Sequence, residues 1–395
     1  MKKFIKDKSN FSLLFFYFSL SLISVISIFL AEYNNNKTPT LFIKQILFYI
    51  ISIFVIYTMQ RISIHTYEKF SIVFFIFTIS LLALVLIAPE SIAPTVNGAK
   101  GWFNFKFFTI QPSEFAKVSS VGIVSFLIVQ DHFKKSSDIV KLIELAIILI
   151  IPFILIMKEN DLGNGLYFIF LFLSLVFLVS SRNKTFFVIY SSVMGLGAFL
   201  LLCAIYFPSF LNIIGLKNYQ LNRILSWLSP EKFTYDYSYQ ITQALNAIKS
   251  GGLTGSFAKN TVYIDEQFND FILSVIAKNF GFIGSVLFIT LYFLFIIKIM
   301  RIAKQCQQGN FSYYFTILTA FNFALPFIIN TYSSTGLIPV IGISLPFISY
   351  GGSSLLANSI LLGIIFKINK TINEEQLADE QDYNDYTDYI DEYSN

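Results

Sequence analysis

The sequence predicts an all-α polytopic membrane protein with about ten transmembrane helices and both termini in the cytoplasm. Of its 395 residues, 55% are hydrophobic and only 13% are charged, whereas an ordinary soluble domain carries about 25% charged residues. Apolar runs close to the length that crosses a bilayer as a helix, about twenty residues, recur as far as position 366. The basic residues outside these runs are concentrated on one side of the predicted membrane.

Ten apolar runs qualify as spans. The polar segment Lys158–Asp161 separates the short fifth and sixth runs and predicts a tight loop between two helices. The first run lacks a small-residue cleavage pattern, so we expect it to be retained rather than removed as a signal peptide. The predicted spans are 11–30, 41–59, 71–88, 113–129, 142–157, 164–180, 185–207, 271–300, 313–330 and 347–366.

Charge predicts the orientation of these spans. With both termini inside, sixteen Lys and Arg fall on cytoplasmic segments and four Lys on the short outer loops, the pattern of the positive-inside rule. One long segment, 208–270, then lies outside between the seventh and eighth spans. Its residues 239–250 carry Ile241, Leu245 and Ile248 at helical spacing. We therefore predict an ordered outer loop that contains an amphipathic helix against the membrane.

The chain divides into a transmembrane domain, 1–370, and an acidic tail, 371–395. The tail holds nine Asp and Glu and no Lys or Arg. Because the net charge is +4, removing these nine negative charges leaves about +13 on the rest of the chain. A block of like charge with few apolar residues does not fold alone, so we predict a disordered cytoplasmic tail.

The few histidines and cysteines exclude several kinds of chemistry. His65 and His132 fall in short polar loops, Cys203 in an apolar run and Cys306 in a basic loop. We expect neither a disulfide nor a metal site or catalytic triad built on these residues. A nucleic acid partner is not expected either.

Glu114 and Lys117 are ionisable residues at the start of the fourth span, where charge is costly. They are three residues apart, so they share a helix face and can pair. Two interpretations are compatible: an ion pair that holds the helix in the bundle, and a polar wall of a substrate cavity.

Asp270 opens the eighth span directly after the long outer loop, with Glu266 four residues earlier. A partly desolvated carboxylate at this position can act as a base, but an aspartate here is also a common helix cap. Lys278 falls inside the predicted span, where it would either extend to the interface or face a water-filled cavity.

Two polar segments border other spans. Asn97–Trp102 precedes the fourth span, and its Lys100 could bind an anionic head group or serve as an interfacial anchor. Ser113 is the predicted N-cap after Pro112. The segment 342–354, which includes Ser349 and Ser353, combines prolines, glycines and serines. Irregular backbone at membrane depth persists only where protein buries it or it lines a cavity, so this segment is a candidate site.

These residues resemble, in order, the motifs of the RodA/FtsW/SpoVE family, also called SEDS. The resemblance covers roughly 95–366. The matching segments are Asn97-Gly98-Ala99-Lys100, Gln111 to Lys117, Asp161-Leu162-Gly163, Tyr239-Gln240 with Gln243, Ser250 to Leu253, Glu266 to Ile272, and Leu345 to Ser354, which reads LPFISYGGSS in full.

The resemblance implies a glycosyltransferase of the bacterial cytoplasmic membrane. It would polymerise lipid II into peptidoglycan strands, with inversion and release of undecaprenyl pyrophosphate, and the family's proposed catalytic aspartate falls on Asp270. A cation must meet the departing pyrophosphate. Lys117, Lys100 and Arg223 are candidates, and a divalent ion such as Mg²⁺ or Mn²⁺ is the alternative. Substrate-binding residues would be Lys100, Glu114, Lys117, Arg223, Gln240, Glu266, Ser349 and Ser353.

The chain departs from the family pattern at several positions. Asn160 replaces the proline before Asp161, and Asp265 replaces the one before Glu266. Lys278-Asn279 stands where the family usually has two acidic residues. Since Asp270 and the LPFISYGGSS segment remain, we predict a divergent but active member.

Three other functions compete with polymerisation. A lipid II flippase would use the same cavity and cations but need no base. A secondary transporter lacks support because the halves show no inverted repeat, and a scaffold for division or elongation proteins is a further alternative. The resemblance also implies a class B penicillin-binding protein as the transpeptidase partner, and Val96–Trp102 favours the elongation type.

Overall fold

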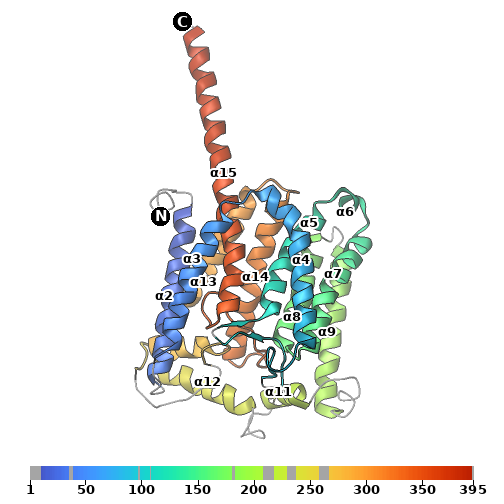
Figure 1. The fold of residues 1–395 in the computed structure, drawn as a ribbon, viewed down its shortest axis with the longest axis vertical. Helices are drawn as coiled ribbons and strands as arrows, with labels where there is room; N and C mark the ends of the chain where they lie inside the picture. Colours follow the sequence, from blue (N-terminus) through green and yellow to red (C-terminus); the bar gives the residue numbers. More distant parts are fainter. Residues whose placement is uncertain are drawn as a thin grey trace.

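The structure is a computed structural model, and it describes residues 10–34, 39–96, 98–106, 108–179, 183–207, 218–228, 237–257 and 267–393. Within these ranges, ten long helices form one bundle (Figure 1), each overlapping one of the ten predicted spans. Nine of them are long and apolar enough to cross a membrane, and α5, with 17 residues, packs among them. The bundle consists of α2 (Phe11–Asn34), α3 (Leu41–Met59), α4 (Ile64–Ile87), α5 (Pro112–Ile128), α7 (Asp138–Lys158), α8 (Leu162–Val179), α9 (Asn183–Tyr206), α13 (Ile272–Gln305), α14 (Phe311–Ser334) and α15 (Gly352–Tyr393).

Helix α5 is buried in this bundle because small and polar side chains let its neighbours approach. A Cβ atom on Gly122 would lie 3.0 Å from Ser71 Oγ of α4. The hydroxyls of Thr78 and Ser119 are hydrogen-bonded at 2.6 Å. Small residues and hydroxyls are the usual means by which helices associate in lipid, where apolar contact alone gives no preference for protein over lipid.

The two ends of the bundle differ. The end that carries α11 (Asn218–Leu228), α12 (Tyr237–Gly251) and the hairpin of β1 (Phe103–Asn104) and β2 (Thr109–Ile110) is called the outer end, because charge predicts it to be extracytoplasmic. The opposite, inner end carries the start of α2, the short helix α6 (Asp131–Lys135) and the projecting end of α15 (Figure 1). Helix α12 confirms the amphipathic helix predicted for 239–250.

The structure differs from the prediction of a disordered tail. Helix α15 continues without a break from the bundle to Tyr393 and projects away from it (Figure 1). The helix is already formed when it leaves the bundle, and extending an existing helix adds one hydrogen bond per residue without a new nucleus. Lys370 and Glu374 also pair across one turn, at 3.6 Å. The division at 370 stays a prediction.

Helix α13 is broken at Gly281, whose backbone has φ +68° and ψ −165°. The segment 251–257 supplies the missing hydrogen bonds on both sides of the break. Phe282 N donates to Gly252 O at 2.8 Å and Ile283 N to Leu253 O at 3.1 Å, while Ser256 N donates to Lys278 O at 2.8 Å. We call the segment 251–257 the clasp. Lys278 therefore lies in the predicted eighth span, on its half-helix 272–280 before the break, which the sequence did not predict.

Candidate active site

Asp270 lies at the outer end, in the turn that leads into α13. The helix begins at Ile272 with Phe271 as its N-cap, so Asp270 precedes the cap. Its backbone carbonyl accepts hydrogen bonds from Asn330 Nδ2 at 3.0 Å and from Ser334 Oγ at 3.4 Å, both on α14. The interpretation of Asp270 as the helix cap is wrong, and its catalytic role stays a prediction.

Ser349 holds the same turn from the LPFISYGGSS segment. Its hydroxyl donates to Asn269 O at 2.7 Å and accepts from Leu345 N at 2.8 Å. Tyr350 N donates to Phe268 O at 2.8 Å. Residues 345–351 of the segment are non-helical, as its composition predicts, and 345–349 are buried. The Ser349 hydroxyl, predicted to bind substrate, is engaged by backbone on both sides and positions the residue before Asp270.

Gly342 is the point where the two charged groups of the site meet. Its φ is +81°, and a Cβ atom there would lie 3.3 Å from Asp270 Oδ2 and 3.7 Å from Arg223 Nη1. The same Nη1 lies 3.5 Å from Val340 O and 3.4 Å from Ile341 O, as a donor to both. The structure therefore brings together Asp270 and Arg223, which are 47 positions apart in the sequence.

The loop between α7 and α8 reaches the same glycine. A Cβ atom on Gly163 would lie only 2.3 Å from Gly342 O, so only a glycine fits against this backbone. Two residues earlier, the Asp161 carboxylate accepts hydrogen bonds from Gln111 Nε2 at 3.1 Å, Asn164 N at 3.0 Å and Asn164 Nδ2 at 2.8 Å. Asp161 thus fastens the loop that packs behind the Asp270–Arg223 pair.

Ser353 connects the start of α15 to β2 and the residue before α5. Its hydroxyl accepts from Gln111 N at 3.0 Å and donates to Thr109 O at 3.0 Å. Ser353 is more open to solvent than Ser349, and through Gln111 it is one hydrogen bond away from Asp161.

The start of α5 differs from the prediction in one respect. The helix begins at Pro112 with Gln111 as its N-cap, so the assignment of Ser113 as the cap is wrong. Proline is favoured at the first helical position because its missing N–H would be unpaired there anyway. The Ser113 hydroxyl instead accepts from Asn164 Nδ2 at 3.2 Å.

Glu114 and Lys117 form the predicted ion pair inside the bundle. Lys117 Nζ lies 2.8 Å from Glu114 Oε1, and the two side chains are 6% and 3% exposed. The ammonium also lies over the ring of Tyr167, 5.5 Å from its centre. Tyr167 in turn donates to Asn322 Oδ1 at 2.7 Å. This buried polar network extends from the site towards the middle of the bundle, consistent with both interpretations of the pair.

Lys100 is held at the end of α4, and none of its hydrogen bonds in the structure reaches the groups around Asp270. Its ammonium donates to Ala88 O at 2.6 Å and its backbone N–H to Glu159 O at 2.9 Å. The carboxyl of Glu159 is fully buried, and neither oxygen has a hydrogen-bond partner in the described part of the chain.

Two predicted substrate-binding residues remain, Gln240 and Glu266. Gln240 lies half-buried on α12, whose buried Ile241 and Ala244 pack with Phe271 and Val340. Glu266 lies outside the described residues.

Sequence reasoning missed Asn330 and Glu159. Asn330 is 2% exposed and donates to both Asp270 O and Ile343 O, the second at 2.9 Å. A polar residue at the end of an apolar span was its only signal. Glu159 was counted as part of a connecting loop, and nothing in the sequence shows that this loop is buried.

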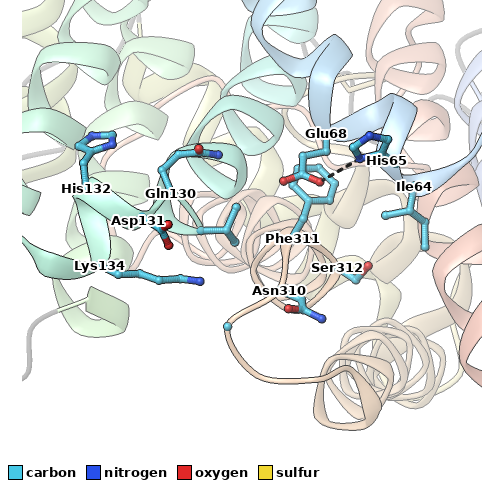
Figure 2. Close-up of a pocket in the computed structure, with 12 residues that line it drawn as sticks. Ile64, His65, Glu68, Gln130, Asp131, His132, Lys134, Asn310, Phe311 and Ser312 are labelled. Carbon is cyan, nitrogen blue, oxygen red and sulfur yellow. Dashed lines mark ion pairs between the residues drawn. The ribbon is translucent and has the colours of Figure 1, made fainter.

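A cavity lies at the inner end of the bundle, remote from Asp270 and Arg223. It measures about 740 Å³ and lies between the starts of α4 and α14 and the α5–α6 connection (Figure 2). His65 and His132 line it, each near a carboxylate, but both lie in first helical turns rather than in the predicted loops. Among the described residues there is no group of three or more His, Cys, Asp or Glu that could hold a metal ion.

Comparisons with known proteins agree on one family. A family model for FtsW, RodA and SpoVE, described as "Cell cycle protein", matches residues 8–374. The "Probable peptidoglycan glycosyltransferase FtsW" of Wigglesworthia glossinidia brevipalpis is 31% identical, over 93% of this chain and 94% of the relative. The protein of the same name from Borreliella burgdorferi is 30% identical, over 88% and 91%.

Solved structures share the fold. A chain from "Structural coordination of polymerization and crosslinking by a peptidoglycan synthase complex" matches with a TM-score of 0.75 and 22% identity, over 92% of this chain and 98% of that one. The Thermus thermophilus rod shape determining protein RodA matches with a TM-score of 0.65 and 22% identity, over 91% and 96%. With the motifs, the ten-helix bundle and the matched 8–374 in place, the chain belongs to the FtsW/RodA/SpoVE family of multi-pass membrane proteins.

Proposed function

We propose that this protein is a peptidoglycan glycosyltransferase that polymerises lipid II, with Asp270 as the general base. The observation that carries the proposal is the convergence of the Asp270 carboxylate and the Arg223 guanidinium on Gly342, at the outer end of the bundle. The names of the curated relatives, about 30% identical over most of the chain, support the same activity.

The two charged groups fit the two demands of the reaction. The carboxylate of Asp270 takes the proton of the acceptor sugar hydroxyl as its oxygen forms a bond to the anomeric carbon of the donor. The bond from that carbon to the pyrophosphate oxygen breaks, and its electron pair leaves with undecaprenyl pyrophosphate. One base suffices because pyrophosphate needs no protonation to leave. General base catalysis of this kind contributes about 10²–10⁴-fold.

Arg223 is positioned to act on the departing charge. A guanidinium stays charged at all working pH values and binds phosphate through two parallel hydrogen bonds. The Lys117 ammonium already pairs with Glu114, so Arg223 is the better candidate for the pyrophosphate. In this proposal the buried network around Glu114 and Asp161 supports the backbone beside which the Asp270 and Arg223 side chains converge.

Asp270→Asn is the decisive variant. We expect purified full-length protein, assayed with lipid II and its transpeptidase partner, to lose polymer formation by at least about 100-fold, because the amide accepts no proton. The Asn330 and Ser334 contacts are to the Asp270 backbone, so the fold and lipid II binding should persist. Glycan length on gels and lipid II binding in the same preparation are the two readouts.

Glu90→Gln is the matched control. Glu90 is another carboxylate at the outer end, but it is exposed and bonded to Thr95. Its amide variant should polymerise normally. Wild-type polymerisation by Asp270→Asn would remove the base assignment, and a variant that still moves lipid II across vesicles would favour the flippase alternative, which needs no base.

A class B penicillin-binding protein is the proposed partner. The structural neighbour belongs to a peptidoglycan synthase complex that combines polymerisation with crosslinking. The relatives carry the FtsW name, whereas the segment Val96–Trp102 favours the RodA type. We propose a role in cell wall synthesis during division or elongation.

A further inference from the structure

Lys278 is a buried cation with no acidic partner among the described residues. Its side chain is 4% exposed. None of the ion pairs in the described part of the chain includes it. The next residue, Asn279, is fully buried but neutral, and accepts a hydrogen bond from Asn34 Nδ2 at 3.0 Å. A buried charge is costly unless an opposite charge or hydrogen-bond acceptors compensate for it, so this ammonium calls for an anion.

The surroundings of Lys278 indicate which anion can reach it. The half-helix 272–280 ends at the Gly281 break, and the clasp 251–257 packs on its backbone, with a Cβ on Gly251 only 3.1 Å from Lys278 Cα. The clasp and the first residue after the break expose large apolar side chains: Leu253 is 70% exposed, Phe257 59% and Phe282 64%. A cation beside exposed apolar groups at the end of a transmembrane bundle matches a lipid, with its phosphate next to its acyl chains.

We propose that Lys278 and the clasp form a binding site for the phosphate of an anionic phospholipid in the outer leaflet, with Leu253, Phe257 and Phe282 against its acyl chains. The exposed Leu253, Phe257 and Phe282 favour a lipid over an acidic side chain of a partner protein, because acyl chains can cover these apolar groups while the phosphate meets the ammonium. The site does not depend on the proposed reaction at Asp270.

Lys278→Met tests the site while it keeps the length and apolar stem of the side chain. Full-length protein in detergent is titrated with phosphatidylglycerol, and bound lipid is counted by native mass spectrometry. We expect about a fivefold weaker affinity, which corresponds to the contribution of about 1 kcal/mol from one basic residue near a membrane surface. Lys278→Arg should bind within twofold of wild type because it keeps the charge.

Lys249→Met is the matched control, since Lys249 is an exposed lysine in the last turn of α12. It should leave the affinity unchanged. Should Lys278→Met fail to fold, Leu253→Ser weakens the acyl contact alone and should also lower the affinity. Inorganic phosphate should displace the lipid poorly, because it lacks acyl chains.

Three outcomes would overturn the proposal. The first is wild-type affinity in Lys278→Met or an equal loss in Lys249→Met. The second is displacement by inorganic phosphate at concentrations similar to those of the lipid. The third is a Lys278→Met protein that keeps its lipid but loses its complex with the transpeptidase, which would assign the ammonium to a partner carboxylate.

Discussion

Glu159 and Asp161 are two buried carboxyl groups in one loop, and their partners differ. Burial, and then the charge of Asp161, raise the pKa of Glu159 to about 9. Burial also raises the pKa of Asp161, but the hydrogen bonds from Asn164 and the charge of Lys117 oppose the shift. Glu159 is therefore protonated at neutral pH, while its neighbour is fastened by polar partners. In the loop beside the candidate site, the Glu159 carboxyl is therefore neutral, and the Asp161 carboxyl is held by hydrogen bonds.

Glu159 should make the stability of the protein fall as pH rises. Burial holds the pKa of its carboxyl at about 9 in the folded state, against an ordinary value of 4.5, so the folded state keeps a proton between these values that the unfolded state loses. Stability must then decrease across this window, by at most about 1.4 kcal/mol per pH unit. Melting temperatures in detergent from pH 5 to 9 should decline more steeply for wild type than for Glu159→Gln, which cannot titrate.

Glu90→Gln again provides the comparison for Glu159→Gln. The hydrogen bonds from Thr95 lower the pKa of the exposed Glu90, so its removal should not flatten the decline between pH 5 and 9. Parallel melting curves for wild type and Glu159→Gln would show that the Glu159 carboxyl is solvated rather than buried.

At the level of elements, the clasp explains why the motif Ser250 to Leu253 contains two glycines. A Cβ on Gly251 would lie 2.0 Å from Ala277 O, and Gly252 has φ +55°, which favours glycine. The carbonyls of the clasp bind the N–H groups that the break in α13 leaves open. An interrupted helix at membrane depth requires such substitute partners. The break sends the half-helix 272–280 along the outer end, where Asp270 directly precedes it.

Gly281→Ala should disrupt this element. The position has φ +68°, which alanine adopts only with strain, and the new methyl group would overlap backbone atoms of Leu253 and Gly255. We expect a loss of at least about 2 kcal/mol, since the overlap adds to the backbone cost. Thermal unfolding followed by size-exclusion fluorescence provides the measurement.

Gly195→Ala serves as the control for the glycine variant. Gly195 lies in α9, and a Cβ there meets no atom within 4 Å. Alanine favours the helix over glycine by up to about 1 kcal/mol, so this variant should not melt earlier than wild type. Equal melting of Gly281→Ala and wild type would mean that the break lies elsewhere.

Over the whole molecule, α15 joins the packed bundle to a free charged extension. Ile368 and Asn369 are essentially buried, and Asn369 Nδ2 donates to Asn10 Oδ1 at 2.8 Å, which ties the helix to the start of α2. From Glu374 the helix is exposed as far as Leu377. The contacts that hold the C-terminal helix therefore end near Ile372.

A chain that stops after Asn373 should remain as stable as the full-length protein. The deletion removes all nine acidic residues of the tail, and every deleted side chain that the structure describes, 374–378 and 381, is exposed. Changes away from buried contacts usually stay within about 0.5 kcal/mol. A stop after Lys367 also removes Ile368 and Asn369 and should lower the melting temperature. If the chain that stops after Asn373 also melts at a lower temperature than the full-length protein, the extension must contact the bundle.

The order of the bundle could be predicted from the sequence because crossing a membrane is a local demand. Each span needs a run of apolar residues of fixed length, and ten such runs correspond to ten helices. The Glu114–Lys117 pair could also be predicted from the sequence, because a spacing of three residues places both side chains on one helix face. The break in α13 and the buried loops could not be predicted. Hydropathy is averaged over a window of residues, and this average does not reveal a single glycine with positive φ.

The sequence by itself determined the membrane class, the ten spans, the amphipathic α12 and the identity of the candidate residues. Only the tertiary structure decided that Arg223, Gly342 and Asp270 meet and that Asn330 holds the turn. It also decided that Glu159 and Lys278 are buried with no oppositely charged partner in the described part of the chain. The physical reason is range. Helix formation in lipid follows from the composition of neighbouring residues, whereas a site assembled from distant segments depends on how the helices pack.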